Sequence, residues 1–359
     1  MLHSKLFRFF PIPQYLILPS FGLEISEKYI RYVELIDTPR GFIVNNYGVE
    51  ELPIGLISKG VITNLVTLSD ILKKIRIEKK IEAVSLSISE EQVYTFQTDI
   101  KVVQGINIRD SILLGLEGHI PIPSENLEFD YSIISQNQNN LRIQVTAVER
   151  QSVQAYVDVC ALAGIQVIAC EYESQALARA LTKIEDKKVI YVINIDELST
   201  TASVVQDGIV VSSSTVPYGG NNAVTAIMKS FNLDKEKAQE VKNKIGINAD
   251  DKYPDLANIL KDSYTPLVTE IINQYNSWLV YIHERSDTYR NIDSIQVVGS
   301  ESLTPGIIDL LQATFHKPVS LGDVWCRIRN DDPHVPSISF NDSLNYGTAI
   351  GLALGSFEI

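Results

Sequence analysis

Cysteine and histidine are scarce in this chain, and neither occurs in a metal-binding pattern. The 359 residues include only 3 cysteines, Cys160, Cys170 and Cys326, and 5 histidines. No CxxC pair, Cys/His ligand spacing or HExxH motif is present, so a zinc site is not expected. A sparse, odd number of cysteines is typical of a reducing compartment, and we therefore expect free thiols in a cytoplasmic protein.

Long hydrophobic runs are also absent. No apolar stretch approaches the roughly 20 residues that a membrane-spanning helix requires. The apolar residues 1–20 are interrupted by Pro11 and Pro13 and lack a small-residue cleavage site, so we interpret them as an N-terminal extension rather than a signal peptide. We expect this extension to pack on the body of the protein, with a contact to a membrane surface or a partner as the alternative.

Positive charge is in deficit, with 31 Lys and Arg against 44 Asp and Glu and a net charge of −13. This balance argues against nucleic acid as a partner, because phosphate binding needs a basic surface. Adjacent acidic pairs such as Glu90-Glu91 are expected to be solvated.

No GxSxG, GxxxxGK[ST] or strand-linked GxGxxG motif is present. The length favours two domains or lobes.

A pattern of three strands and polar turns occurs twice, about half the chain apart. The predicted strands lie at 23–25, 29–36 and 42–49, and again at about 189–193, 202–205 and 209–215. Glu24 matches Asn194 and Ser26 matches Asp196, since 194 − 24 and 196 − 26 both give 170. We therefore predict an α/β protein built by internal duplication.

Helical periodicity and capping residues follow each copy. The predicted helices lie at 65–75, 108–117, 152–163, 174–184, 235–245, 305–315 and 346–355, with a long helix opened by Thr265-Pro266. Asp234 is predicted to cap the helix that ends at Gly246. Gly299 lies between a predicted strand and the helix at Pro305, an arrangement in which backbone N–H groups can face a ligand.

Five segments together carry a resemblance to a known family. They are IRYVEL (30–35), HIPIPSENLEFDYSII (119–134), LAGIQVIACEYESQALARAL (162–181), SFNLDKEKAQEVKNKIG (230–246) and YGTAIGLALG (346–355). Their order resembles the actin-like ATPase fold, and more specifically the PilM family of cytoplasmic type IV pilus assembly proteins. The resemblance covers nearly everything from Phe21 on.

The resemblance implies an actin-like, ribonuclease H-like duplicated fold of two lobes. The first lobe is expected at 21–186 plus 346–359, with a small α+β subdomain inserted at about 99–148. The second lobe is expected at 187–345, with a helical insert at about 229–262. In ATP-binding members of this fold, the two hairpin turns hold the phosphates.

The resemblance also implies positions for a nucleotide, if its site is retained. These are Glu24, Ser26, Arg31, Asn194, Asp196, Ser199, Thr200, Gly219, Gly220, Gln239, Lys242, Gly299 and Ser300. Glu24 and Asp196 are the candidate metal ligands if Mg-ATP binds.

Both phosphate turns depart from the Asp-x-Gly pattern of the fold. Glu24 and Ser26 stand at the first turn, and Asn194 and Asp196 at the second. Gln239 replaces the family's ribose-facing glutamate, whereas Lys242 is kept. The carboxylate of Asp196 would stand close to the phosphates of a bound nucleotide, and two like charges ~4 Å apart repel by about 4 kcal/mol at an effective dielectric of 20. We therefore expect ATP binding to be weakened or lost and no meaningful hydrolysis, and both Mg-ATP and the absence of a cofactor remain open.

The function implied by the resemblance is that of a scaffold in a type IV pilus or related secretion platform. The expected partners are the N-terminal cytoplasmic peptide of a single-span membrane protein, similar to PilN, and other inner-membrane platform components. The protein is therefore expected at the inner face of the cytoplasmic membrane. We expect the peptide in a groove between the large and small parts of the first lobe, with Val93, Tyr94 and Phe96 at its mouth.

Two other classes remain as alternatives. An ATPase or a sugar-kinase-like phosphotransferase on the same fold needs the Asp and Gly turns, and both are altered here. A cell-division filament protein similar to FtsA is expected to carry a C-terminal amphipathic membrane helix, whereas this chain ends at GSFEI after the predicted closing helix.

Overall fold

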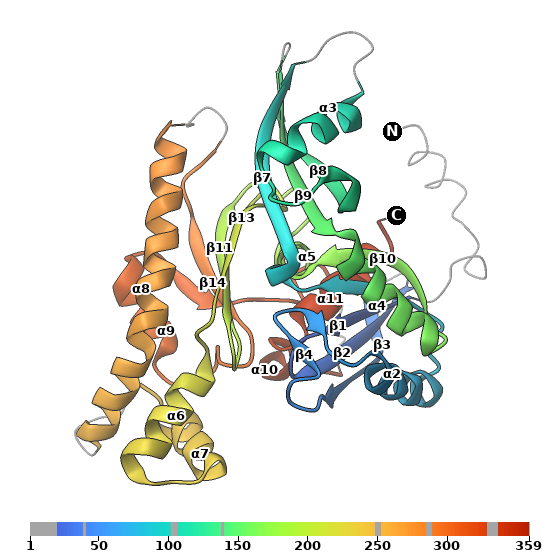
Figure 1. Cartoon of the computed structure of the whole chain (residues 1–359). Helices are drawn as coiled ribbons and strands as arrows, with labels where there is room; N and C mark the ends of the chain where they lie inside the picture. Colours follow the sequence, from blue (N-terminus) through green and yellow to red (C-terminus); the bar gives the residue numbers. More distant parts are fainter. Residues whose placement is uncertain are drawn as a thin grey trace.

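The structure is a computed structural model of the whole chain, and it describes residues 20–38, 41–101, 107–137, 140–247, 253–284, 289–328 and 337–358. The predicted N-terminal extension up to residue 19 and the turn residues Pro39 and Arg40 lie outside these ranges. Two larger bodies stand side by side, and a smaller sheet rises from one of them (Figure 1).

Two five-stranded sheets share one topology. The first contains β1 (Ser20–Ile25), β2 (Tyr29–Thr38), β3 (Gly41–Glu51), β6 (Ala83–Ile88) and β10 (Gln166–Tyr172), in the order β10-β6-β1-β2-β3. The second contains β11 (Val189–Ile195), β12 (Thr200–Gln206), β13 (Ile209–Val216), β14 (Ser294–Val298) and β15 (Val319–Leu321), in the order β13-β12-β11-β14-β15. In both sheets the first strand pairs antiparallel with the second and parallel with a later strand, which confirms the predicted duplication.

The small sheet has the order β7-β9-β8 and consists of β7 (Val93–Lys101), β9 (Asn140–Glu149) and β8 (Leu127–Gln136). The helix α3 (Ile108–Gly115) covers one of its faces, where Ile112 packs with Ile143 and Val145. The predicted subdomain start at about residue 99 falls inside β7. Because β7 pairs with β9 from Val93 onward, the small sheet begins at that residue.

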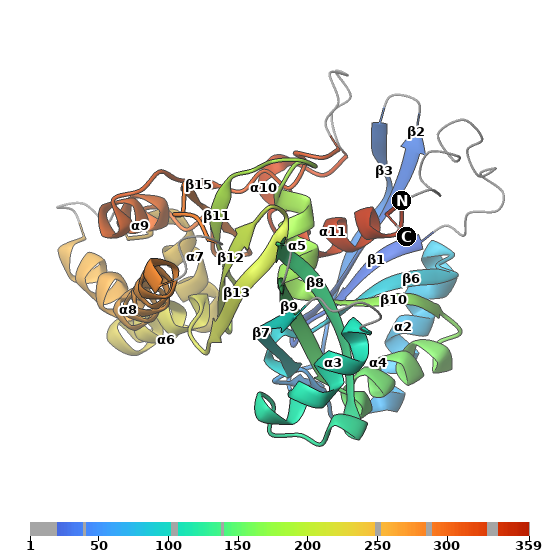
Figure 2. The ribbon, with the colours of Figure 1, turned by 90° about the horizontal axis from the view of Figure 1, so that it is seen from above.

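The helices of the first body lie on both faces of its sheet. On one face are α2 (Leu65–Lys79) and α4 (Arg150–Leu162), beside the short strands β4 (Ile57–Ser58) and β5 (Val61–Ile62). On the other are α5 (Glu173–Leu181) and α11 (Gly347–Gly355), which lie between the two large sheets in Figure 2. A Cβ at Gly351 would lie 1.7 Å from the carbonyl oxygen of Ala176, so only glycine permits this contact between α11 and α5.

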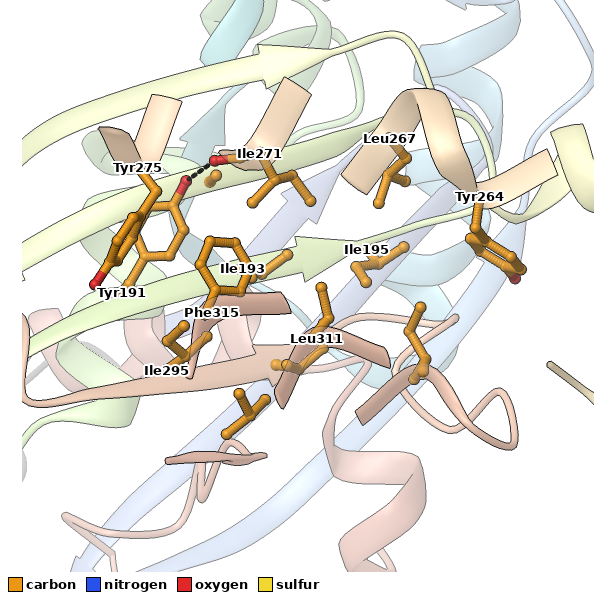
Figure 3. Packing of buried hydrophobic residues seen from close by; sticks show 14 of the residues in the cluster. Tyr191, Ile193, Ile195, Tyr264, Leu267, Ile271, Tyr275, Ile295, Leu311 and Phe315 are labelled. Carbon is orange, nitrogen blue, oxygen red and sulfur yellow. Dashed lines mark hydrogen bonds between the residues drawn. The ribbon is translucent and has the colours of Figure 1, made fainter. Parts of the chain in front are cut away.

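The second body packs its helices on the outer face of its sheet. These are α6 (Gly220–Phe231), α7 (Lys235–Ile245), α8 (Pro254–Glu284) and α9 (Ile307–Phe315), and the short α10 (Phe340–Ser343) lies near the inter-lobe side. Tyr191 packs edge-on against Tyr275 and Phe315 in this core, and its hydroxyl donates to the Ile271 carbonyl at 3.2 Å (Figure 3). The buried face of the long helix consists of Leu267, Ile271, Tyr275, Trp278 and Ile282.

The predicted start of the long helix was wrong. Thr265-Pro266 does not open the long helix, because α8 begins at Pro254 and carries Pro266 in its interior. Leu260, Tyr264 and Leu267 continue one buried stripe past the proline, so packing outweighs the lost backbone hydrogen bond. The helix predicted from Pro305 begins at Ile307, after Gly306 at a φ of 85°. Asp234 is confirmed as an N-cap, since its side chain accepts from the Lys237 N–H.

Candidate functional site: an acidic cleft between the lobes

The two matching hairpin turns face each other across a cleft of about 250 Å³. The carboxyl groups that line it belong to Glu24, Glu27, Glu90, Glu91, Glu173, Asp196 and Glu197. The cations in its lining belong to Lys28, Arg31 and Lys59. Acidic residues thus outnumber basic ones, and the cleft favours a cation over an anion.

An ion pair joins the two turns directly. Lys28 Nζ lies 2.8 and 2.7 Å from the two carboxylate oxygens of Glu197, and the Tyr29 hydroxyl donates to the same carboxylate at 3.0 Å. Hydrogen bonds to Lys28 and Tyr29 hold the pKa of Glu197 below its usual range, although burial opposes this shift. Lys28 and Glu197 therefore connect the first lobe to the second at the level of the predicted phosphate turns.

Glu24 forms a second ion pair inside the first lobe. Arg31 Nη1 donates to Glu24 Oε1 at 2.9 Å, and both side chains are buried. Burial raises the pKa of Glu24 to about 7; Arg31 opposes the shift and Asp196 adds to it. Glu24 Oε2 has no hydrogen-bond partner among the described residues. The carboxyl group is thus balanced between its charged and neutral forms near neutral pH.

At the second turn, Asp196 is held by its neighbours. Its Oδ1 accepts from the backbone N–H of Ser300 at 3.2 Å and from the Ser300 hydroxyl at 3.1 Å. Its Oδ2 accepts from Asn194 Nδ2 at 3.2 Å. Asn194, Asp196 and Ser300, three of the predicted nucleotide positions, are therefore brought together, and they hydrogen-bond to one another.

The backbone N–H groups near these turns are used within the protein. The N–H of Gly299 donates to Leu344 at 3.1 Å, and that of Glu301 donates to Ile195 at 3.0 Å. The N–H of Gly220 donates to Asp196 at 3.0 Å. These N–H groups around Gly299 are thus paired within the protein, because the segment that follows this glycine turns back onto β11.

Several other predicted positions lie away from the cleft lining. Lys242 is fully buried and pairs with Glu301, which also accepts from the Thr304 hydroxyl at 3.2 Å. The Thr200 hydroxyl donates to the Tyr218 carbonyl at 2.7 Å. Gln239 donates to Asn243 on α7 at 3.1 Å.

The two glycines after the second copy serve close packing. A Cβ at Gly220 would lie 2.0 Å from the carboxylate carbon of Glu301, and one at Gly219 would lie 2.2 Å from the carbonyl oxygen of Asp196. Of the remaining predicted positions, Ser26, Arg31 and Ser199 do line the cleft.

Two acidic cleft residues, Glu90 and Glu173, were missed or misplaced by the sequence patterns. Glu90 was expected to be solvated but is only 7% exposed, and burial raises the pKa of its carboxyl group. Burial likewise raises the pKa of Glu173 well above the ordinary value, and Glu24 and Glu90 add to the shift. The position of Glu173 directly after the strand β10 was the signal that could have marked it, because strand ends converge on such clefts. Among the described residues, no group of three or more His, Cys, Asp or Glu side chains is arranged to hold a metal ion.

A separate groove of about 310 Å³ runs between the small sheet and the first large sheet. Its apolar lining consists of Ile88, Phe129, Tyr131, Val148, Val153, Tyr172 and Ile209. The strands β8 and β10, which border it, are each the edge strand of their sheet. The groove lies between the large and small parts of the first lobe, where the sequence analysis expected a partner peptide.

The three residues predicted at its mouth do not line this groove. Phe96 stacks on His119 with ring centroids 4.2 Å apart, on the α3 side of the small sheet. Val93 packs against the cores of the large sheets, and Tyr94 is 37% exposed. The error arises because β7 forms the edge of the small sheet opposite to β8.

Two duplicated sheets with a cleft between their hairpins define an actin-like protein, and known structures agree. The chain is similar to the ethanolamine utilization protein EutJ from Carboxydothermus hydrogenoformans, with 14% identity, a TM-score of 0.52, and 96% of this chain and 91% of that one covered. It is also similar to ADP-bound MreB5 of Spiroplasma citri, with 15% identity, a TM-score of 0.53, and 86% and 94% covered. These likenesses confirm the predicted fold.

Residues 22–357 match the family described as type IV pilus assembly protein PilM, and the chain belongs to that family. It is similar to a chain of the PilM-PilN type IV pilus biogenesis complex, with 18% identity, a TM-score of 0.79, and 96% of this chain and 100% of that chain covered. The predicted family is thus confirmed, and the protein is an actin-like protein of type IV pilus assembly. In the part of the chain that is described, no helix is both long and apolar enough to cross a membrane.

Proposed function

We propose that this protein is a non-catalytic scaffold that binds the N-terminal cytoplasmic peptide of a single-span membrane partner similar to PilN. The observation that carries the proposal is the apolar groove between two strand edges, β8 and β10. An extended peptide can pair with such an edge through its main chain while its apolar side chains enter the groove. Through this peptide and other platform components, the protein is held at the inner face of the cytoplasmic membrane.

Charge supports a basic partner. Glu128, Asp130 and Glu171 border the groove, and no Lys or Arg is present among the described residues of its lining. Glu128 is paired with Arg150 and Glu171 with Arg179, so part of this charge is already balanced. The net charge of −13 adds a long-range attraction for a tail that contains Lys or Arg.

Weakened nucleotide binding is part of the same proposal. The cleft contains an excess of carboxyl groups, and Lys28 is already paired with Glu197 of the second turn. Its volume of about 250 Å³ is below the ~300–1,000 Å³ of ordinary small-molecule sites. The arrangement does not suit a magnesium-bound triphosphate, and the scaffold role needs no hydrolysis.

The experiment begins with recovery of partners from native membranes on the tagged full-length protein. A synthetic peptide from the cytoplasmic N-terminus of each single-span partner is then titrated against wild type. Ser132→Trp fills the groove from β8, whereas Gln136→Trp places the same side chain on the same strand outside the lining. We expect Ser132→Trp to weaken binding at least tenfold and Gln136→Trp to leave it unchanged. Recovery of soluble metabolic proteins alone, or stabilisation of the fold by a sugar, would favour the kinase-like alternative.

A further inference from the structure

A third hollow, of about 590 Å³, lies between the small sheet and the second lobe. Its walls come from β7, β9, β13 and α8. It shares only Gln144 with the groove and no lining residue with the cleft. Since β7 and β13 are each the last strand of their sheet, two strand edges border this inter-lobe cavity.

Three buried polar atoms in its lining lack a partner. Gln144 Oε1, Gln274 Oε1 and Trp278 Nε1 have no hydrogen-bond partner among the described residues. Gln144 and Trp278 are only 3% and 5% exposed. Because buried polar groups are nearly always paired in native proteins, these atoms call for a ligand with at least two N–H donors and one acceptor.

The protein already bridges this gap at one point with an amide. Gln97 of β7 donates from Nε2 to the Val211 carbonyl of β13 at 2.7 Å, and its Oε1 accepts from the hydroxyl of Tyr281 at 2.6 Å. Further along β13, Gln175 of α5 donates to the Gly208 carbonyl and accepts from the Val210 N–H. Carboxamides of the first lobe thus bond to the main chain of Gly208, Val210 and Val211 at the start of β13.

Beyond Val211, β13 continues along the cavity wall as Ser212, Ser213 and Ser214. Among the described residues of this lining, the surface is polar and nearly uncharged, since Glu270 is the only carboxylate and no Lys or Arg is present. The main-chain amides of a bound peptide can continue along β13 the hydrogen bonding that the side-chain amide of Gln97 begins at Val211. The single carboxylate disfavours a ligand with net negative charge.

We propose that the inter-lobe cavity binds an extended polypeptide segment without net negative charge, whose main-chain N–H and C=O groups pair with Gln144, Gln274 and Trp278. The peptide lies between the edges of β7 and β13, a recurrent mode of peptide recognition. Because it contacts the small sheet on one side and α8 on the other, its binding fixes the small subdomain relative to the second lobe. This site is distinct from the groove proposed for the membrane partner.

The test uses random peptides of about ten residues, which cross the cavity at about 3.3 Å per residue, displayed against the full-length protein. Peptides that still bind the variant Asn273→Trp are discarded, because this tryptophan fills the cavity from an exposed position on α8. Asn276→Trp is the matched control, since Asn276 is exposed on the same helix and outside the lining. We expect peptides that bind wild type and Asn276→Trp equally and lose affinity at least tenfold on Asn273→Trp.

Gln144 supplies a second test, because its substitution should change the stability of the protein and its affinity for the peptides in opposite directions. Gln144→Met removes an unpaired buried oxygen, so it should raise the melting temperature of the free protein while weakening the selected peptides about tenfold. Gln274→Met should weaken them likewise. A glutamine with a merely structural role would not combine a higher melting temperature with weaker peptide binding when it is substituted. The proposal is overturned if no selected peptide depends on the cavity, if the selected peptides are acidic, or if both glutamine variants bind them as tightly as wild type.

Discussion

Lys28 and Glu197 form an ion pair across the inter-lobe cleft, with Nζ 2.7 Å from the nearer carboxylate oxygen. Each residue belongs to one of the two hairpin turns that would hold phosphates in an ATP-binding member of this fold. In such a member, the nucleotide contacts both turns and joins the lobes. Here the chain's own charges make that connection.

The first prediction concerns the strength of this connection. Both side chains are about a quarter exposed, so the pair should contribute no more than about 1 kcal/mol to stability. A double-mutant cycle of Lys28→Met and Glu197→Gln, measured by urea unfolding, gives the coupling energy directly. High salt should reduce it. A coupling energy of zero would show that this ion pair does not help to hold the two lobes together.

The second prediction concerns nucleotide binding. Ser26→Gly with Asp196→Gly removes a Cβ from one turn and a carboxylate from the other, and adding Glu197→Gln releases Lys28 for a phosphate. Mg-ATP affinity should be weak or absent in wild type and should rise with each step, since each removes an obstacle to the triphosphate. Calorimetry at constant ionic strength is the measurement. A submicromolar dissociation constant for wild type would contradict the weakened site.

The third prediction concerns pH. The folded-state pKa of Glu24 is raised from 4.5 to about 7, chiefly by burial, with Asp196 adding to the shift and Arg31 opposing it. The stability that the neutral carboxyl provides is therefore complete below pH 4.5 and is lost as pH rises through about 7. Between pH 4.5 and about 7, Glu24→Gln should make the slope of unfolding free energy against pH more positive, by up to about 1.4 kcal/mol per pH unit.

Glu240 provides a control of opposite sign for that slope. The hydrogen bond from Lys244 holds the pKa of its carboxyl group below the usual range. The stability that the Glu240–Lys244 pair contributes is present above the unfolded-state pKa of Glu240 and is lost as pH falls. Glu240→Gln should therefore change the acid-side slope of unfolding free energy against pH in the direction opposite to that of Glu24→Gln. If Glu24→Gln and Glu240→Gln gave slopes that changed in the same direction, the assignment of the raised pKa to Glu24 would be wrong.

The fourth prediction concerns the approach of α11 to α5. Gly351→Ala places a methyl group 1.7 Å from a backbone oxygen, which cannot move without displacing α5. We expect a loss of at least about 3 kcal/mol in unfolding free energy. Gly115→Ala is the matched control, because a Cβ at that helical glycine meets no atom within 4 Å. It should be neutral or stabilise the protein by up to about 1 kcal/mol. Equal effects of the two substitutions would disprove the close contact.

The duplicated strands could be predicted because their pattern is local. Alternating apolar residues and turn residues at a constant offset of 170 identify both hairpins without any long-range information. The start of α8 could not be predicted in this way, since Pro266 is a strong local signal for a helix start. The buried stripe of Leu260, Tyr264 and Leu267 outweighs that signal only when the tertiary packing is known.

The candidate site was less predictable than the fold, because its chemistry depends on which side chains meet across the cleft. The positions of Asn194, Asp196 and Ser300 were anticipated, but their hydrogen bonds to one another were not. The pairing of Lys28 with Glu197 spans 169 residues of sequence. Neither residue's identity specifies that contact, so it emerges only when the two lobes are placed together.

Lys242 illustrates the same point and gives the fifth prediction. It matches a lysine of the nucleotide-binding pattern, yet it is fully buried and paired with Glu301. Glu301→Gln leaves a buried ammonium group without its counter-charge, which should cost about 3–5 kcal/mol. The double variant Lys242→Met, Glu301→Gln removes both charges and should recover most of that loss.

Chemical denaturation of the two single variants and the double variant measures this interaction. If the lysine instead served a nucleotide, Lys242→Met would lower ATP affinity in the rebuilt Ser26→Gly, Asp196→Gly protein while leaving stability nearly unchanged. A structural lysine gives the opposite result: a large loss of stability in each single variant and little change in ATP affinity. We expect the structural result, because the Lys242 side chain is enclosed next to Gly220, where the Glu301 carboxylate occupies the space that a Cβ would need.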